Sequence, residues 1–138
     1  MKIGKRNNKW LCEKLIELWR KYFPDLQPEN KIFVRFGQPA KRQLGKIKHG
    51  RLNKPNPNTY IVINGHFRRP IVPEFVVEAV LAHELIHYLH GFKSPHQQQF
   101  RHPHRGGVVK DELTRRGLDG IMKEQKEWLK NNWSKIVQ

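Results

Sequence analysis

Cysteine, membrane-length apolar runs and acidic residues are all scarce in this sequence. A single cysteine, Cys12, excludes an internal disulfide and also a zinc ribbon, which needs pairs of cysteines. The apolar stretch 75–81 contains Glu78 and is far shorter than the roughly 20 residues that cross a membrane. The basic N-terminus leads into an amphipathic segment instead of the apolar core of a signal peptide. We therefore expect a cytoplasmic or nucleoid-associated protein.

Acidic residues are missing altogether from the segment 31–73, in a chain whose net charge is +15. Solvated surfaces normally mix both signs of charge, so this segment predicts contact with a polyanion, and nucleic acid is the expected partner. A general role in solubility is the alternative. The basic residues expected to touch nucleic acid are Lys41, Arg42, Lys46, Lys48, Arg51, Lys54, Arg68 and Arg69. Near them, Phe67 and Tyr60 could stack on bases, although β-alternation favours a core position for Tyr60.

Hydrophobic periodicity predicts a single α+β domain spanning residues 1–138. Residues 9–23 place leucines at helical spacing, so an amphipathic helix is expected before Pro24, with Cys12 as a small core residue. Alternating β-forming residues then predict a small sheet of about three strands. These strands are expected at 31–36, near 43–48 and at 59–64.

A long apolar helix is expected in the centre of the sequence. Pro73 and Glu74 suit its first turn and Gly91 suits its end, because proline and an acid favour a helix N-terminus and glycine a C-terminus. Its apolar residues continue nearly all round, which predicts a buried position. Further helical segments are expected at 96–101, 108–116 and 120–136.

His83, Glu84 and His87 form an HExxH motif inside this helix. Residues four apart on a helix project from one face about 6 Å apart, which allows two imidazoles to bind one zinc ion. Glu84 projects about 100° away, where it could act as the general base on a water at the metal's open position. Burying these groups without partners would be costly. We therefore predict one Zn²⁺ per chain, bound by His83 and His87.

A third zinc ligand is expected because catalytic zinc usually has three protein ligands. His96 is favoured, since the chain can turn back at Gly91 and bring this histidine towards the pair. The alternatives are Glu112 first, and then His102 and His104.

Three sequence segments occur here in the same order as in one known protein family. Leu44-Gly45 in a strand, a strand ending IVIN, and PEFVVEAVLAHELIHYLHG follow one another, with His96 and Phe100 after them. In this order the segment from about 42 to about 101 resembles the SprT-like zinc metallopeptidases. The resemblance implies a zincin-like fold, with Glu84 as general base and with the zinc ligands His83, His87 and His96. It also implies protein substrates, which in the best-known members are attached to DNA.

Three functions are compatible with these features. The leading prediction is a zinc-dependent endopeptidase that cleaves proteins at or near DNA. A substrate peptide would add to the sheet edge as a strand, with DNA held alongside by the basic segment. The alternatives are a nucleic-acid-binding module with a structural zinc site, and a zinc peptidase that cleaves a regulator away from DNA. Nothing in the sequence specifies an oligomeric state.

Overall fold

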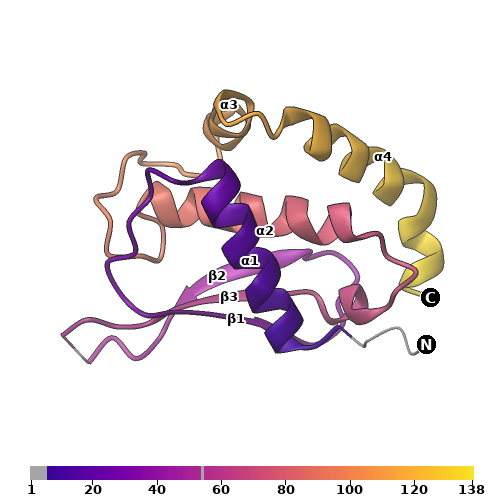
Figure 1. The fold of residues 1–138 in the computed structure, drawn as a ribbon, viewed down its shortest axis with the longest axis horizontal. Coiled ribbons are helices and arrows are strands. Elements are labelled where there is room, and N and C mark those ends of the chain that lie inside the picture. Colours follow the sequence, from indigo (N-terminus) through magenta and orange to yellow (C-terminus); the bar gives the residue numbers. More distant parts are fainter. Residues whose placement is uncertain (1–5, 54) are drawn as a thin grey trace.

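Residues 6–53 and 55–138 are described by the computed structural model, and they form four α-helices, one 3-10 helix and three β-strands. The predicted α+β class is confirmed (Figure 1). The elements in chain order are α1 (Asn8–Tyr22), β1 (Ile32–Phe36), β2 (Gly45–His49), β3 (Thr59–Ile63), η1 (Gly65–Arg68), α2 (Glu74–Leu89), α3 (Val108–Arg115) and α4 (Asp119–Ile136). Within the described residues, no helix combines the length and the apolar character that crossing a membrane requires.

Helix α1 follows its sequence pattern. The Oδ1 atom of Asn7 caps the first turn by accepting a hydrogen bond from the backbone N–H of Trp10 at 2.8 Å. The buried face of the helix carries Leu11, Leu15 and Leu18. Cys12 is exposed, so the prediction that it fills the core is wrong. It lies about 100° round the helix from Leu11, at the edge of the buried face.

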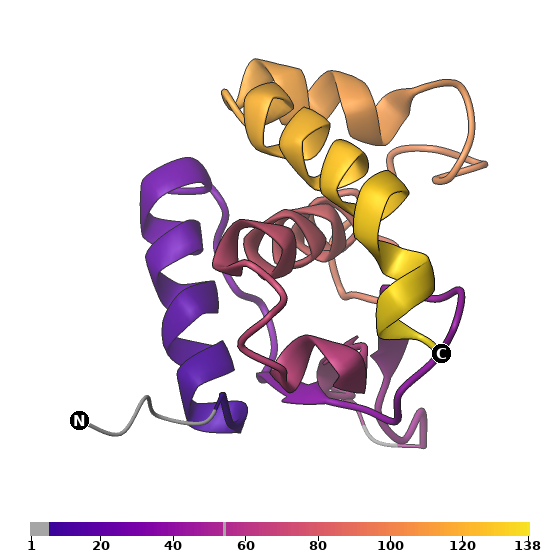
Figure 2. The same ribbon diagram turned by 90° about the vertical axis from the view of Figure 1, so that its right-hand side faces the viewer.

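The three strands form one sheet in the order β1-β3-β2. Strand β1 runs parallel to β3, and β2 runs antiparallel to it, so β2 is an edge strand. All four α-helices lie on the same side of this sheet (Figure 2). The strand residues that face the helices are buried: Val34, Phe36, Ile47, Ile61 and Ile63. The opposite side of the sheet is not covered by any helix of the described chain (Figure 2).

Asn64 follows β3 directly and holds the loop that leads from β1 to β2. Its Nδ2 atom donates to the carbonyl oxygens of Ala40 and Gln43, each at 2.8 Å. Its Oδ1 atom accepts from the backbone N–H of Ala40 at 3.2 Å and of His66 at 2.9 Å. One buried amide therefore fixes the position at which Gly45 begins β2.

Helix α2 is the central element, and both of its predicted ends are confirmed. It begins after Pro73 with Glu74 in the first turn, and it ends before Gly91. Gly91 has a φ of +80°, the left-handed conformation that ends many helices, and the N–H of Phe92 donates back to the carbonyl of His87 at 2.9 Å. The helix is buried nearly all round, as its apolar composition predicts.

Two segments differ from the sequence-based expectations. No helix forms at 96–101, because the backbone there instead joins the end of α2, where Gln99 N donates to the His90 carbonyl at 3.0 Å. The 3-10 helix η1 was not expected, and it buries Phe67 completely against Trp133 of α4, with ring centroids 5.5 Å apart. Phe67 therefore cannot offer its ring to a base.

Candidate functional site

His83 and His87 lie one turn apart on α2, with their Nε2 atoms 3.1 Å apart. Two nitrogens that share one tetrahedral zinc ion at about 2.0–2.1 Å are themselves about 3.3–3.4 Å apart. The observed spacing is therefore close to the spacing between two zinc ligands. The predicted pairing of these two histidines on one helix face is present in the structure.

Burial keeps both imidazoles neutral, which is the form that binds a metal. Desolvation, and then the neighbouring imidazoles of His83, His104 and His90, lower the pKa of His87 to about 3. Desolvation, and then His104, also lower the pKa of His83. The Nδ1 atom of His87 is buried and has no hydrogen-bond partner among the described residues. Two neutral imidazoles whose Nε2 atoms lie this close together are suited to binding one cation.

Glu84 lies beside the pair and is 4% exposed. Burial alone raises the pKa of this carboxyl to about 8, since no cation offsets the loss of water. Its carboxylate faces Gly45, the first residue of β2. A Cβ atom at position 45 would lie 3.3 Å from Glu84 Oε2 and only 2.6 Å from Val80 Cγ1. The absence of a side chain at Gly45 therefore allows the edge strand to lie directly against the carboxylate.

A cleft of about 460 Å³ opens in front of these three residues. One wall is α2, with His83, Glu84 and His87, and another is the edge strand β2 with the loop before it. The remaining lining residues are Gln43, Gly45, Lys46, Ile47, Phe92 and His104. The buried carboxylate and the two imidazoles are thus reached from solvent along the free edge of the sheet.

His104 is the third imidazole at this cleft. Its ring centroid is 4.4 Å from that of His87 and 5.0 Å from the ring of Phe92, and the residue is exposed. Among residues 6–53 and 55–138, no three His, Cys, Asp or Glu side chains already converge in a metal-binding arrangement. The His104 ring packs against the His87 ring at an angle of 48° between the planes. It would therefore have to turn before its nitrogen could join those of His83 and His87 around one ion.

His96, the expected third ligand, lies elsewhere in the structure. The chain does turn back at Gly91, but it then runs along the Tyr88 side of α2, where Ser94 Oγ donates to the Tyr88 carbonyl at 2.7 Å. The His96 ring therefore lies 4.8 Å from the Tyr88 ring, with its Nδ1 atom 3.9 Å from Glu29 Oε1. Tyr88 is about 100° round the helix from His87, which is why His96 is not at the cleft.

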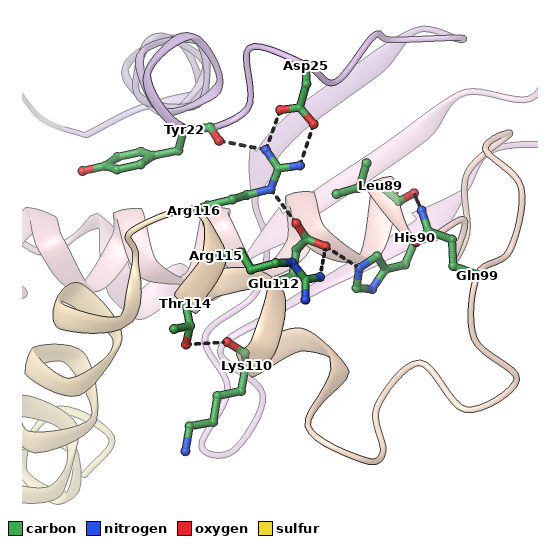
Figure 3. Close-up of polar contacts among 10 residues, drawn as sticks. All are labelled: Tyr22, Asp25, Leu89, His90, Gln99, Lys110, Glu112, Thr114, Arg115 and Arg116. Atoms are coloured by element: carbon green, nitrogen blue, oxygen red, sulfur yellow. Dashed lines mark hydrogen bonds and ion pairs between the residues drawn. The ribbon is translucent and has the colours of Figure 1, made fainter.

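Glu112, the main alternative, belongs to a separate buried network (Figure 3). Its Oε1 atom is 3.3 Å from His90 Nε2 and 2.7 Å from Arg115 Nη2, and its Oε2 atom accepts from Arg116 Nε at 2.9 Å. Burial alone would raise the pKa of Glu112, but hydrogen bonds from Arg115, His90 and Arg116 bring it below its ordinary value. Arg116 also pairs with both oxygens of Asp25, at 2.7 and 2.8 Å. Glu112 is therefore fully engaged as a structural partner.

The expected nucleic-acid contacts are spread over several surface segments. All of those that the structure describes are exposed except Lys48, which is half-buried on β2. Arg68 lies over the Phe36 ring at 5.2 Å, and Arg69 donates to the carbonyl of Ile136 at 3.1 Å. Lys54 lies outside the described residues.

A second hollow, of about 650 Å³, adjoins the cleft at His83, which lines both. It lies between α3 and α4, and its wall is mainly apolar with lysines at Lys110, Lys123 and Lys126. The apolar lining residues are Leu44, Val109, Leu113, Met122 and Leu129. The hollow offers space for an apolar side chain next to the histidine pair.

Sequence reasoning missed the importance of His104, Asn64 and the glycine at the start of β2. The position of His104 depends on the path of the loop 92–107, which carries no periodic signal. Asn64 and Gly45 did have a signal, because a polar residue ending an apolar strand and a glycine beginning one both suggest a specific backbone role. No family model matches this chain, and neither a curated protein nor a solved structure matches it.

Proposed function

We propose that this protein is a zinc-dependent metalloendopeptidase that acts on proteins at or near nucleic acid. The observation that carries this proposal is the 3.1 Å spacing between the Nε2 atoms of His83 and His87 beside a buried, unpaired Glu84 carboxylate. An open cleft gives a substrate access to all three residues. A merely structural histidine pair would need neither the buried carboxylate nor the cleft.

The donor set fits zinc. Imidazole is a good zinc ligand, and burial holds the pair in the neutral form. We assign His83, His87 and His104 as the residues that hold the ion. Rotation about the side-chain bonds of an exposed loop residue costs little, so the His104 ring can turn towards the pair.

A zinc ion held there would supply Lewis acidity and would lower the pKa of a water molecule to about 7. Glu84 supplies the proton transfers. A cation bound by the histidines would favour the ionised form of this carboxyl group, and a carboxylate stripped of most of its hydration is a stronger base than an exposed glutamate. Glu84 takes a proton from the attacking water and later delivers it to the amine nitrogen that leaves.

The edge strand β2 supplies a docking surface for a peptide. Its free backbone edge borders the cleft, and an extended peptide can pair with such an edge as an additional strand. Gly45 keeps that edge close to Glu84, so a peptide paired there would pass directly in front of the carboxylate. The apolar hollow between α3 and α4 would then receive one of the peptide's side chains.

The charge of the chain supports action near nucleic acid. Ten basic residues and no acids fall in the segment 31–73, which forms the sheet and its loops. One of these residues, Lys46, lines the cleft itself. With one cysteine the chain forms no internal disulfide, which is compatible with the reducing cytoplasm, where DNA and RNA are present. A purely structural zinc site is less consistent with this arrangement, because such sites are closed by four protein ligands.

Metal analysis is the first test of this proposal. Gently purified protein should contain about one zinc ion per chain, since three imidazoles suit a catalytic site with one open position. His83→Ala and His87→Ala should each lose the ion, while His102→Ala, which changes an exposed histidine outside the cleft lining, should keep it. Absence of zinc from the unaltered protein would exclude the peptidase.

The second test is hydrolysis of casein by the Glu84→Gln variant, with and without single-stranded DNA. Removal of a general base should lower the rate by at least about a hundredfold, while zinc content and melting temperature stay unchanged. Glu124→Gln is the matched control, because Glu124 is an exposed residue of α4. Equal hydrolysis by Glu84→Gln and the unaltered protein would remove Glu84 from the mechanism.

A further inference from the structure

We propose that the open face of the sheet is a binding site for single-stranded nucleic acid, with Phe33 and Tyr60 as a base-stacking pair. The inference rests on the proposed function in one respect, because it names the surface that would hold the peptidase near nucleic acid. The geometry itself does not depend on the metal site.

The two rings belong to one cross-strand row of the sheet. Phe33 of β1 pairs with Tyr60 of β3, which pairs in turn with Lys48 of β2. These residues alternate with the buried ones, so they face away from the helices. The two aromatic rings stack with centroids 5.5 Å apart and planes at 22°, and Lys48 Nζ is 5.9 Å from the Tyr60 ring. The expectation of a core position for Tyr60 is therefore wrong.

Phe33 is unusually exposed for an aromatic residue. Its exposed fraction is 45%, and Tyr60 beside it is only partly buried. Cross-strand aromatic stacking by itself can stabilise a sheet. Stabilisation does not explain why the surroundings of this pair are uniformly basic.

A second row adds two cations to the same face. Arg35, Val62 and Lys46 pair across the three strands, two residues along from the aromatic row, which is about 7 Å. Both charged residues are exposed and border a hollow of about 270 Å³ over Val62. No acid occurs in any of the three strands or in the loops between them. The face thus combines flat rings with positive charge and carries no competing acid.

This combination matches single-stranded nucleic acid in particular. Unpaired bases stack on aromatic rings, while the phosphates lie against neighbouring Lys and Arg side chains. Bases in a duplex are already stacked inside the helix and cannot reach a ring on a flat sheet. Lys46 borders both this face and the candidate cleft, so a bound strand would lie just across β2 from His83 and Glu84.

The test is the anisotropy of a fluorescein-labelled 15-nucleotide oligo-dT, with oligo-U and a duplex of equal length as further arms. All measurements use the Glu84→Gln background, so that the result does not depend on proteolysis. Phe33→Leu and Tyr60→Leu should each weaken binding of the single strands by at least about fivefold. Phe33→Tyr and Tyr60→Phe, which keep a ring, should bind as the parent does. Ile16→Ala is the matched control, since Ile16 is 44% exposed on α1, on the helical side.

The salt dependence separates stacking from charge. Arg35→Gln should reduce the slope of log affinity against log salt concentration by about 1, the value for the loss of one phosphate contact. The ring-removing variants should leave that slope unchanged. Circular dichroism confirms the fold of each variant, and the edge-strand change Phe33→Leu serves alone if Tyr60→Leu unfolds. Three outcomes would overturn the proposal: no binding of any single strand, equal binding of the duplex, or ring-removing variants that bind as the parent does. None of them would bear on zinc content or on casein hydrolysis.

Discussion

Helix α2 and the residue that follows it contribute to two buried clusters of histidine and glutamate. The glutamate of one cluster has basic partners, and the glutamate of the other has none. At the C-terminal end of α2, His90 meets Glu112, which also binds Arg115 and Arg116 (Figure 3). One and two turns earlier, Glu84 has no cation to offset its burial, and the two histidines beside it contact each other. The difference shows in the carboxyl groups, since the pKa of Glu112 is lowered and that of Glu84 is raised to about 8.

This difference distinguishes side chains that stabilise the fold from side chains that are available to bind a ligand. A buried carboxylate with several cationic partners holds elements together, here α2, α3 and the loop after α1. A buried carboxylate without such partners costs stability, and it persists where function requires it. The unpaired cluster, and not the paired one, is therefore the candidate active site.

The largest expected effect on stability comes from breaking the paired cluster. Glu112→Ala should lower the free energy of unfolding by about 3 kcal/mol, because His90 is left buried without its partner while Arg116 keeps its bonds to Asp25. Urea denaturation measures this loss, with the exposed Glu124→Ala as control. Glu84→Gln should change the same quantity by less than about 1 kcal/mol. A large loss of stability in Glu84→Gln and none in Glu112→Ala would show instead that the Glu84 cluster, and not the Glu112 cluster, stabilises the fold.

The next effect concerns the third ligand. His104→Ala should weaken zinc binding by at least about a hundredfold, because even outer partners of metal ligands contribute 10- to 100-fold. His96→Ala should keep the affinity of the unaltered protein, since its ring lies against Tyr88. Competition with a chromogenic chelator gives both values. Zinc loss confined to His96→Ala would restore the sequence-based expectation and show that the loop rearranges on binding.

A smaller effect is expected where the edge strand touches the unpaired cluster. Gly45→Ala should lower the free energy of unfolding by about 1–3 kcal/mol, because the new Cβ would meet Val80 Cγ1 at 2.6 Å. It should also reduce casein hydrolysis, since Glu84 Oε2 lies 3.3 Å from that position. Thermal melting and a rate assay test the two statements separately. An unchanged melting temperature of Gly45→Ala would show that β2 can move away from α2 without loss of stability.

The smallest effect is the pH dependence of the paired cluster. Hydrogen bonding by Arg116 lowers the pKa of Asp25, and the pKa of Glu112 is lowered as well. Carboxyl groups with a lowered folded pKa contribute stability that is complete above their unfolded values and is lost as the pH falls through the folded ones. Asp25→Asn should therefore flatten the acid side of a stability curve, by less than about 1 kcal/mol because Asp25 is exposed. An unchanged acid side would assign the pH dependence to other carboxyl groups.

Local signals predicted most of the fold and the centre of the candidate site. The leucine spacing of α1, the proline and glycine at the ends of α2 and the alternation of the strands are properties of short segments. The His83–His87 pair was predictable for the same reason, because a spacing of four fixes the relative position of two side chains on any helix.

Features that depend on long-range packing were not predictable in this way. The loop after α2 has no periodicity, so its sequence did not show that His104, and not His96, would reach the cleft. Tyr60 was misplaced because Ile61, Val62 and Ile63 are apolar on both sides of the strand, which hides the side that faces the helices. Phe67 was misjudged because its partner, Trp133, lies on the last helix.

The last turns of α4 have a mechanical consequence for the cleft. Trp133 Nε1 donates to the carbonyl of Lys41 at 2.7 Å, and Arg69 donates to the carbonyl of Ile136 at 3.1 Å. Lys41 lies two residues before Gln43, which lines the cleft wall. Outward movement of this wall would therefore strain the bond between Lys41 and the indole. The packing of α4 against the loop before β2 is thus expected to resist widening of the candidate cleft.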